Sequence, residues 1–455
     1  MTGNHCAAAR ISPEPSVQSV TPDVRIGLSA VCNPSYVEVP GTTTVRQTHG
    51  PRWQMGVPPS FLICENDRAS NTLYLDRPLT PRKDGAVVRP KAMFTPSTLN
   101  PVKLLHIVGA RPNFPKLAPV HRAAKALELQ QIIVHTGQHY DEAMSASFFR
   151  DLGIPAPDVN LEVGSGSHAA QTARIIERFE PVLIQHNPDW LVLYGDVNST
   201  MATAIVAAKL GVRIAHVEAG LRSGDRTMPE EINRLVTDRL ADLLLTPSLD
   251  ANVTLRSEGE PESEIVFVGN VMIDTLFASL PLAETTGFAK KLGADGSHVV
   301  VTLHRPSNVD DTARLQALAA ALQELSATRL VIFPAHPRTQ ARLRDTGISL
   351  DGIRLMDPIG YHEMLDVVRS AHAVVTDSGG LQEETTALGV PCFTLRPNTE
   401  RPITITEGTN QLVQNPRDVA ALVAKAMRPT TLRRPEGWDG KAGERVAAEL
   451  ASRPR

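Results

Sequence analysis

Short apolar runs and amphipathic segments alternate along this chain from Lys103 onwards. The runs have the length of buried strands, and the segments between them have the length and the apolar period of helices. Such alternation predicts a parallel sheet with helices on both faces, because parallel neighbours need a long crossover between them. The predicted strands of this first series are "VKLLHIV", "QIIVHTG", "DWLVLYG", "VRIAHVE", "DLLLTP" and "SEIVFVG".

A second alternating series begins near His298, with predicted strands "HVVVTLH", "RLVIFPAH", "HAVVTDS" and "VPCFTLR". We therefore predict an α/β fold of two doubly wound, Rossmann-like domains, residues 103–272 and 280–428, facing each other across a cleft. Ligands of such domains bind at the carboxyl ends of the strands, so the active site is expected there. Residues 436–451, around "GWDGKAGERVAAEL", predict a last helix that packs back on the first domain.

Residues 1–100 differ in character from the rest of the chain. They are rich in Pro, Ser, Thr and Arg and show no sustained apolar period, so we predict a disordered leader. Met93 precedes the first predicted strand by about the distance expected of a native start. This spacing predicts that residues 1–92 are not part of the natural protein.

Charge and cysteine content exclude several classes of protein. Lys and Arg number 46 against 49 Asp and Glu, a formal charge of -3, so nothing overall favours nucleic acid or an acidic membrane as a partner. The sequence has no apolar run of membrane-spanning length and no signal-peptide pattern, which predicts a cytoplasmic protein. Only Cys392 of four cysteines lies in the alternating part, so neither disulfides nor a zinc site is predicted.

Polar clusters directly follow the predicted strands of both series. Taken singly, each has an ordinary structural explanation: Asp196 is well placed to cap a helix, Glu230 and Glu231 stand in a helix first turn, and Gly379-Gly380 suits a tight turn. Their coincidence at strand ends in both domains favours a functional site. The clusters contain Arg111 and Lys116; Asp196; Glu218, Arg222, Glu230 and Glu231; His304 and Arg305; His336; and the run "DSGGLQEE".

The stretch "VVTDSGGLQEETTALGVP", residues 374–391, has the order of a strand, a glycine turn and a helix. A helix start offers unpaired backbone N–H groups and positive dipole charge, and glycine lets the backbone approach closely, so a phosphate is the expected ligand. Neither a "GxGxxG" run after the first strand of either series nor a "GxxxxGK[ST]" run occurs. A tightly bound dinucleotide and P-loop phosphoryl transfer are therefore disfavoured.

Over residues 103–451 the chain resembles the bacterial non-hydrolysing UDP-N-acetylglucosamine 2-epimerases. The resemblance implies two Rossmann-like domains in a glycosyltransferase-B-like arrangement, with the last helix crossing back to the first domain. The stretches that carry it are "GARPNFPKLAPV", "HTGQHYDEAMS", "GDVNSTMAT", "HVEAGLRSGDRTMPEEINR", "GNVMIDTL", "LHRPSN", "TDSGGLQEET" and "TERPITITEGTN".

The resemblance also implies roles for individual residues. Ser378, Gly379 and Gly380 match the family's diphosphate-binding turn, and Glu384 matches the glutamate that binds the uridine ribose hydroxyls. The catalytic residues implied are the carboxylates Asp196, Glu218 and Glu230 and the histidine His304. The cations expected to bind substrate are Arg111, Lys116, Arg222 and Arg401.

The reaction implied is inversion at C2 of the sugar, which interconverts UDP-GlcNAc and UDP-ManNAc. The C2 proton has no carbonyl on its carbon, so the family first eliminates UDP to give 2-acetamidoglucal and then adds UDP back. This scheme needs carboxylates near C2 and cations at the diphosphate. It requires neither a metal nor NAD, and the residues do not distinguish the carboxylate that removes the proton from the one that returns it.

Some bacterial members bind a second UDP-GlcNAc as an activator. Gln138 and His139 match one part of that regulatory site, but "GSGSHAAQTA" has no arginine before its helix. The alternatives are an epimerase or hydrolase for another UDP-sugar, such as a UDP-2,3-diacetamido uronic acid, a glycosyltransferase of the same architecture, and a non-catalytic UDP-sugar-binding protein. A homodimer is expected by resemblance.

Overall fold

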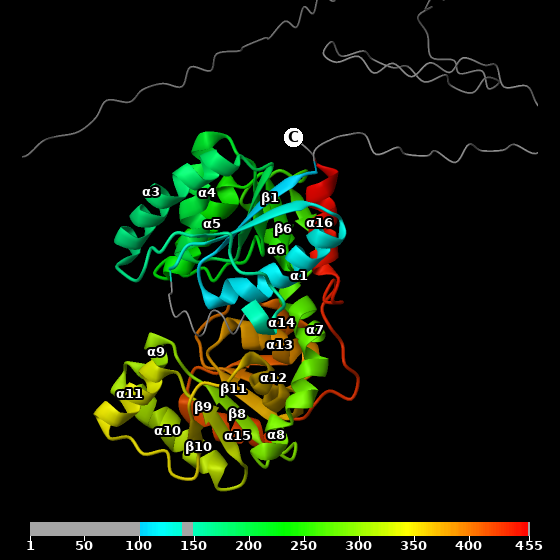
Figure 1. Cartoon of the computed structure of the whole chain (residues 1–455). Coiled ribbons are helices and arrows are strands. Elements are labelled where there is room, and N and C mark those ends of the chain that lie inside the picture. Colours follow the sequence, from blue (N-terminus) through cyan, green and yellow to red (C-terminus); the bar gives the residue numbers. More distant parts are fainter. Residues whose placement is uncertain (1–100, 139–148, 454–455) are drawn as a thin grey trace, which may run out of the picture. The chain divides into compact units, whose positions relative to one another are not determined.

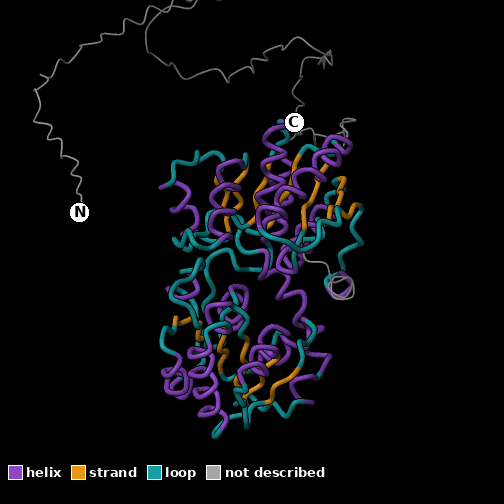
Figure 2. The backbone as a smooth tube through the Cα atoms, turned by 90° about the vertical axis from the view of Figure 1, so that its left-hand side faces the viewer, coloured by secondary structure: helices purple, strands orange, loops and turns teal. Residues whose placement is uncertain are grey.

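The computed structural model describes residues 101–138 and 149–453, in which the chain forms two parallel sheets (Figures 1 and 2). The predicted leader, residues 1–100, lies outside the described residues. The first sheet has seven strands in the order β3-β2-β1-β4-β5-β6-β7. Its strands are β1 (Lys103–Val108), β2 (Gln130–His135), β3 (Val159–Asn160), β4 (Trp190–Tyr194), β5 (Ile214–Val217), β6 (Leu243–Thr246) and β7 (Ile265–Phe267).

Helices cover both faces of this first sheet, because alternate residues of its strands feed two separate cores. Leu104 of β1 belongs to a core shared with α1 and α16, whereas Leu105 belongs to one shared with α3 and α4. Figure 1 shows α16, in red, beside α1. The helices of this half are α1 (Phe114–Ala126), α3 (His168–His186), α4 (Asn198–Leu210), α5 (Pro229–Leu240), α6 (Leu249–Ser257) and α16 (Ala442–Ser452), with a short 3-10 helix at Arg111–Asn113.

The second sheet repeats this plan with six strands in the order β10-β9-β8-β11-β12-β13. Val299 of β8 packs toward α10 and α15, and Val300 packs toward α12 and α13. The strands are β8 (Val299–Thr302), β9 (Val331–Pro334), β10 (Arg354–Met356), β11 (Ala373–Thr376), β12 (Cys392–Thr394) and β13 (Asn410–Leu412). The helices are α8 (Phe288–Lys291), α9 (Pro306–Val309), α10 (Thr312–Ser326), α11 (Pro337–Thr346), α12 (Tyr361–Ser370), α13 (Gly379–Leu388), α14 (Ile403–Thr406) and α15 (Val419–Lys425), with a 3-10 helix at Pro416–Asp418.

Two segments connect the halves. The chain leaves the first sheet through α7 (Val271–Thr286), which contacts both α1 and α12, and it returns before α16. Asp274 of α7 accepts hydrogen bonds from the backbone amides of Ala442 and Gly443, at 3.1 and 2.7 Å, and so caps α16. Trp438 is buried and donates its indole N–H to the carbonyl of Pro247, at 3.1 Å. The predicted return of the last helix to the first half is thereby confirmed.

The predicted alternation is confirmed for both sheets. Three short strands, β3, β10 and β13, are absent from the prediction because two or three half-exposed residues carry no readable period. Within the described residues, no helix is both long and apolar enough to cross a membrane.

Candidate active site

The carboxylates and cations predicted for the first half lie on turns at one edge of its sheet. Lys116 stands in the first turn of α1, after β1. Asp196 follows β4 after Gly195, and Glu218 directly follows β5. Glu230 lies in the first turn of α5. Parallel strands end at the same edge, so residues separated by a hundred positions in the chain share one place in the fold.

Glu218 pairs with one cation from each half of the molecule. Its backbone has a φ of 77°, an uncommon value for a residue with a side chain. One carboxylate oxygen binds the ammonium of Lys116, and the other binds the guanidinium of Arg401 at 2.7 Å. Burial acts to raise the pKa of Glu218, but these two cations outweigh it and hold that pKa below its ordinary value. Glu218 is therefore an ionised carboxylate at neutral pH.

Arg401 belongs to the second half and joins it to the first. Besides Glu218 it binds Glu383 of α13, at 2.9 Å, and its sequence neighbour Glu400, at 2.5 Å. Burial acts to lower the pKa of Arg401, but the three glutamates raise it well above its ordinary value. Asn270 also donates a hydrogen bond to Glu383, at 2.8 Å. The strand ends of the two sheets thus meet through a buried network of opposite charges.

Asp196 is held in place by two residues of α5. Arg234 forms an ion pair with its carboxylate, and Asn233 donates a hydrogen bond to its backbone carbonyl at 2.8 Å. Arg234 also binds Glu231, at 2.6 Å. The sequence prediction did not single out Arg234, although its position one turn after Glu230 in "PEEINR" is a readable signal.

Charges of the first half also act on residues of the second. Burial and the charge of Arg396 lower the pKa of Arg305, an effect that the carboxylate of Glu230, among others, opposes. Burial and the charges of His304 and Arg111 lower the pKa of His336. The charges of Glu230 and Arg111 therefore act on titratable side chains of the second half.

Asp377 organises the site edge of the second half. Its carboxylate accepts hydrogen bonds from the backbone amides of His304 and Arg305, at 3.1 and 3.0 Å, and from the side-chain amide of Asn308, at 3.0 Å. The imidazole of His304 lies 2.9 Å away and is itself 46% exposed. Burial acts to raise the pKa of Asp377, but His304 and these donors hold it below its ordinary value. Asp377, which sequence reasoning assigned no role, fixes the turn that presents His304.

The predicted phosphate turn opens α13. Ser378 is the N-cap residue, its amide bonds Thr376 at 2.9 Å, and Gly379 and Gly380 are the first helical residues. A Cβ on Gly379 would lie 2.8 Å from a guanidinium nitrogen of Arg401. Because Gly379 has no Cβ, the guanidinium of Arg401 can lie against the start of α13. A cation beside a helix start suits a diphosphate.

Glu384, one turn further along α13, is buried and accepts a hydrogen bond from Tyr361, at 3.0 Å. Burial raises the pKa of Glu384 to about 7, although the hydrogen bond from Tyr361 opposes this shift. This carboxyl exchanges its proton near neutral pH, and only its ionised form offers both oxygens purely as acceptors for hydroxyl hydrogens.

Two other residues of the prediction, Arg222 and Gln138, are held by neighbours within the first half. The guanidinium of Arg222 binds Asp238 and Glu258, each at 2.7 Å, and both partners belong to the first half. The side-chain oxygen of Gln138 accepts hydrogen bonds from the backbone and hydroxyl of Ser199, at 3.0 and 2.7 Å. His139 lies outside the described residues.

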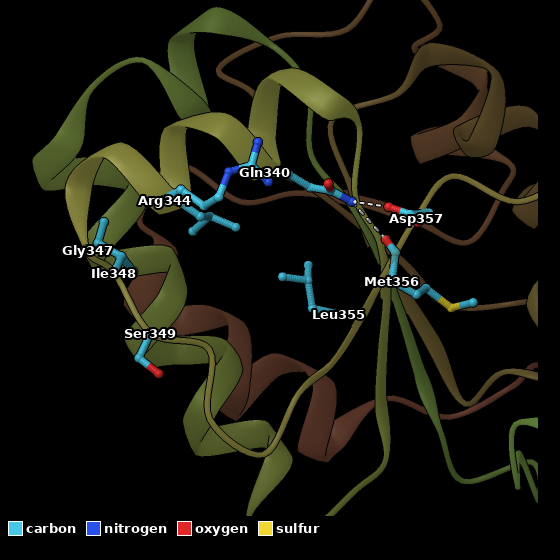
Figure 3. Close-up of a pocket in the computed structure, with 9 residues that line it drawn as sticks. Gln340, Arg344, Gly347, Ile348, Ser349, Leu355, Met356 and Asp357 are labelled. Atoms are coloured by element: carbon cyan, nitrogen blue, oxygen red, sulfur yellow. Dashed lines mark hydrogen bonds between the residues drawn. The ribbon is translucent and has the colours of Figure 1, made fainter.

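Two cavities lie apart from these residues. One of about 560 Å³ lies beside edge strand β10, where Gln340 bonds Met356 and Asp357 (Figure 3). Another of about 620 Å³ lies between α1, α7 and α16. None of the predicted site residues lines either cavity. The described residues include no group of three or more His, Cys, Asp or Glu side chains placed to hold a metal ion.

Two parallel α/β sheets whose strand ends meet over shared carboxylates and cations define a glycosyltransferase-B-like protein. A family model described as UDP-N-acetylglucosamine 2-epimerase matches residues 121–451. The chain belongs to the UDP-N-acetylglucosamine 2-epimerase family.

Individual relatives support this assignment. The UDP-N-acetylglucosamine 2-epimerase of Methanocaldococcus jannaschii is 40% identical over 362 residues, covering 77% of this chain and 99% of the relative. The UDP-2,3-diacetamido-2,3-dideoxy-D-glucuronate 2-epimerase of Pseudomonas aeruginosa is also 40% identical, over 358 residues, with the same coverage of both chains. The crystal structure of the M. jannaschii UDP-GlcNAc 2-epimerase in complex with UDP-GlcNAc and UDP aligns with a TM-score of 0.72 and 39% identity, over 77% of this chain and all of that one.

Proposed function

We propose that this protein interconverts UDP-GlcNAc and UDP-ManNAc by inverting C2 of the sugar. The observation that carries the proposal is the placement of Glu218 between Lys116 and Arg401, with Arg401 coming from the other half of the molecule. Cations from two halves around an ionised carboxylate suit a reaction in which a proton leaves carbon as a diphosphate leaves its neighbour.

The proposed elimination balances as follows. A carboxylate takes the C2 proton, the C2–H electron pair forms the C1=C2 double bond, and the C1–O bond breaks with its electrons passing to the diphosphate oxygen of UDP. The glycine turn of α13, with Arg401, Lys116 and Arg111, is proposed to stabilise the departing negative charge. In the return step a proton reaches the other face of C2, and the UDP oxygen attacks C1.

Inversion needs one acid/base group on each face of the C2 carbon. Asp196, Glu218 and Glu230 are the proposed set, with His304 beside the diphosphate. Glu218 is ionised because of its cations, so it can accept a proton once the diphosphate shares Lys116 and Arg401 with it. Asp196 is partly exposed beside Arg234, which keeps it within reach of a bound sugar.

The test is proton NMR of the purified chain with UDP-GlcNAc in deuterated water. Appearance of UDP-ManNAc carrying deuterium at C2 is expected, because the removed proton exchanges with solvent before its return. Stoichiometric free UDP would instead identify a hydrolase. An unchanged spectrum from folded protein would overturn the proposal for this substrate.

A UDP-2,3-diacetamido uronic acid is the second candidate substrate, because the Pseudomonas aeruginosa relative that bears that substrate's name is as similar as the M. jannaschii one. The same NMR experiment with this sugar decides between them through the ratio of kcat/KM values. The glycosyltransferase alternative would require an acceptor for turnover, and a non-catalytic binding protein would leave both sugars unchanged.

We also propose that the enzyme is a homodimer in the cytoplasm. The dimer is supported by the family resemblance, and the location is supported by a sequence without a membrane-spanning apolar run or a signal-peptide pattern. Light scattering coupled to size-exclusion chromatography would give a mass of two chains, and a mass of one chain would contradict the dimer.

A further inference from the structure

A buried pair, His216 and Asp238, lies behind the turns that carry Asp196 and Glu218. His216 belongs to β5 and Asp238 to α5, and their side chains are 0% and 1% exposed. The imidazole Nδ1 and a carboxylate oxygen of Asp238 are 2.5 Å apart. Neither residue has a part in the proposed proton transfers, so their burial beside the site calls for another role.

The pair binds the backbone of both turns. The Nε2 atom of His216 lies 2.8 Å from the carbonyl oxygen of Gly195, the residue before Asp196. The other oxygen of Asp238 accepts a hydrogen bond from the amide of Gly220, two residues after Glu218, at 3.1 Å. One side-chain pair therefore ties the end of β4 to the turn after β5.

These partners determine which ring nitrogens of His216 donate hydrogen bonds. A backbone carbonyl and a carboxylate are both acceptors, so His216 must donate from both ring nitrogens. Arg222 binds Asp238 at 2.7 Å and keeps that carboxylate ionised. His216 thus has a fixed acceptor at each ring nitrogen, which makes it a directional brace.

Both turns have a residue in the left-handed region, and the one at Glu218 needs such a brace. Gly195 has a φ of 63°, and a Cβ there would lie 2.5 Å from the ammonium of Lys116. Glu218 occupies the left-handed region although it carries a side chain. For a residue with a side chain, this conformation persists only where the surroundings hold it. A small rotation at either turn would change the placement of Asp196 relative to Glu218.

We propose that His216 and Asp238 are positioning residues, which set the relative placement of Asp196 and Glu218 through their bonds to the Gly195 carbonyl and the Gly220 amide. This inference rests on the proposed function for the roles of the two carboxylates. It assigns to the pair no contact with substrate.

The kinetic test is Asp238→Asn. An amide keeps only one of the two acceptor oxygens, so either the His216 imidazole or the Gly220 amide loses its partner and the tie between the turns relaxes. We expect kcat to fall about 10- to 100-fold, the usual scale for a small misplacement of catalytic groups, with KM and UDP affinity changed less than about threefold. Equal losses in binding and turnover, or a wild-type kcat, would overturn the proposal.

Asp242→Asn is the matched control. Asp242 accepts a hydrogen bond from the amide of Ile214, at 2.8 Å, and so pins the opposite end of the same strand β5. Its loss weakens β5 without touching either turn, so kcat is expected to stay within about twofold of wild type at a comparable loss of thermal stability. A kcat loss equal to that of Asp238→Asn would reduce the pair to a general stabilising role and overturn the inference.

Two further measurements do not depend on activity, so they separate this inference from the proposed function. Nitrogen-15 NMR of wild-type imidazoles near neutral pH should show hydrogens on both ring nitrogens of His216. A crystal structure of Asp238→Asn should show the Gly195 carbonyl and the Glu218 turn displaced while β5 keeps its place. A neutral imidazole or undisplaced turns would overturn the proposal, whereas failure of the wild type to turn over substrate would count only against the proposed function.

Discussion

Strands β4 and β11 hold the same place in their two sheets, and each leads into an aspartate. β4 lies beside β1 in the first sheet, as β11 lies beside β8 in the second. Asp196, after β4, is 27% exposed and pairs with one arginine. Asp377, after β11, is fully buried and is surrounded by backbone and side-chain donors.

The difference shows how one scaffold position serves two purposes. In the first half the aspartate remains accessible, next to other ionisable side chains that suit acid/base chemistry. In the second half the aspartate builds a turn, and the glycines and helix start that follow it suit a diphosphate. The comparison therefore predicts that variants of the Asp196 and Glu218 carboxylates lose turnover, whereas variants of Asp377 and of α13 lose stability or binding.

The largest effect is expected from Asp196→Asn and Glu218→Gln. Loss of an acid/base group should lower kcat about 10³-fold, while UDP affinity stays within about threefold because the glycine turn is intact. Turnover assays and UDP titration calorimetry check both, and wild-type-like rates would remove these residues from the mechanism.

Asp377→Asn should act mainly on stability. An amide in place of the carboxylate leaves buried donors unpaired, at a cost of about 2 to 3 kcal/mol in the free energy of unfolding. Because the folded-state pKa of Asp377 is lowered, its wild-type contribution is present above its unfolded pKa and is lost as pH falls through the folded value. Chemical denaturation near neutral and at acidic pH measures this, and Asp196→Asn is the control that should change stability little.

Glu384→Ala should weaken UDP binding about 10- to 30-fold, or roughly 1.5 to 2 kcal/mol, as expected for hydrogen bonds to a charged group. With saturating substrate, kcat should remain within about threefold of wild type. Calorimetry with UDP gives the affinity. A large loss of kcat at unchanged affinity would place Glu384 in the chemistry instead. The separation of turnover residues from binding residues would then be wrong.

The smallest effect concerns pH. Burial raises the pKa of Glu384 to about 7, and only the ionised form accepts two hydroxyl hydrogens, so affinity should be full above that pH and decline below it. UDP-GlcNAc should bind about tenfold more weakly near pH 6 than near pH 8. Tyr361→Phe should move the midpoint of this pH dependence to higher pH, because the hydrogen bond from Tyr361 lowers the pKa of Glu384. Glu384→Gln should show no such midpoint.

Much of this architecture could be predicted from sequence, because a parallel strand covered on both faces is a continuous apolar run. β1 and β11 are such runs, whereas edge strands β10 and β13 are too short to show a period. The end of each apolar run marks where a strand stops, so the turn residues that follow it were predictable too.

Pairings between side chains were not predictable in this way. The partners of Arg401, Glu218 and Glu383, come from distant parts of the chain, and nothing local records them. Arg222 stands in the polar run after β5 and was expected at the substrate, yet its partners Asp238 and Glu258 come from α5 and the end of α6. Local pattern thus predicted which sheet edge carries the polar residues, and tertiary packing decided which of those residues pair with one another.

The return of α16 to the first half also bears on how the protein is made. Val446, Ala447 and Leu450 complete the same core as Leu104 of the opening strand. During synthesis that core stays open while the whole second half emerges from the ribosome, since its last residues are translated at the end. The second half is in effect an insertion within the first, and it can mature as a unit before the half that encloses it in sequence is finished.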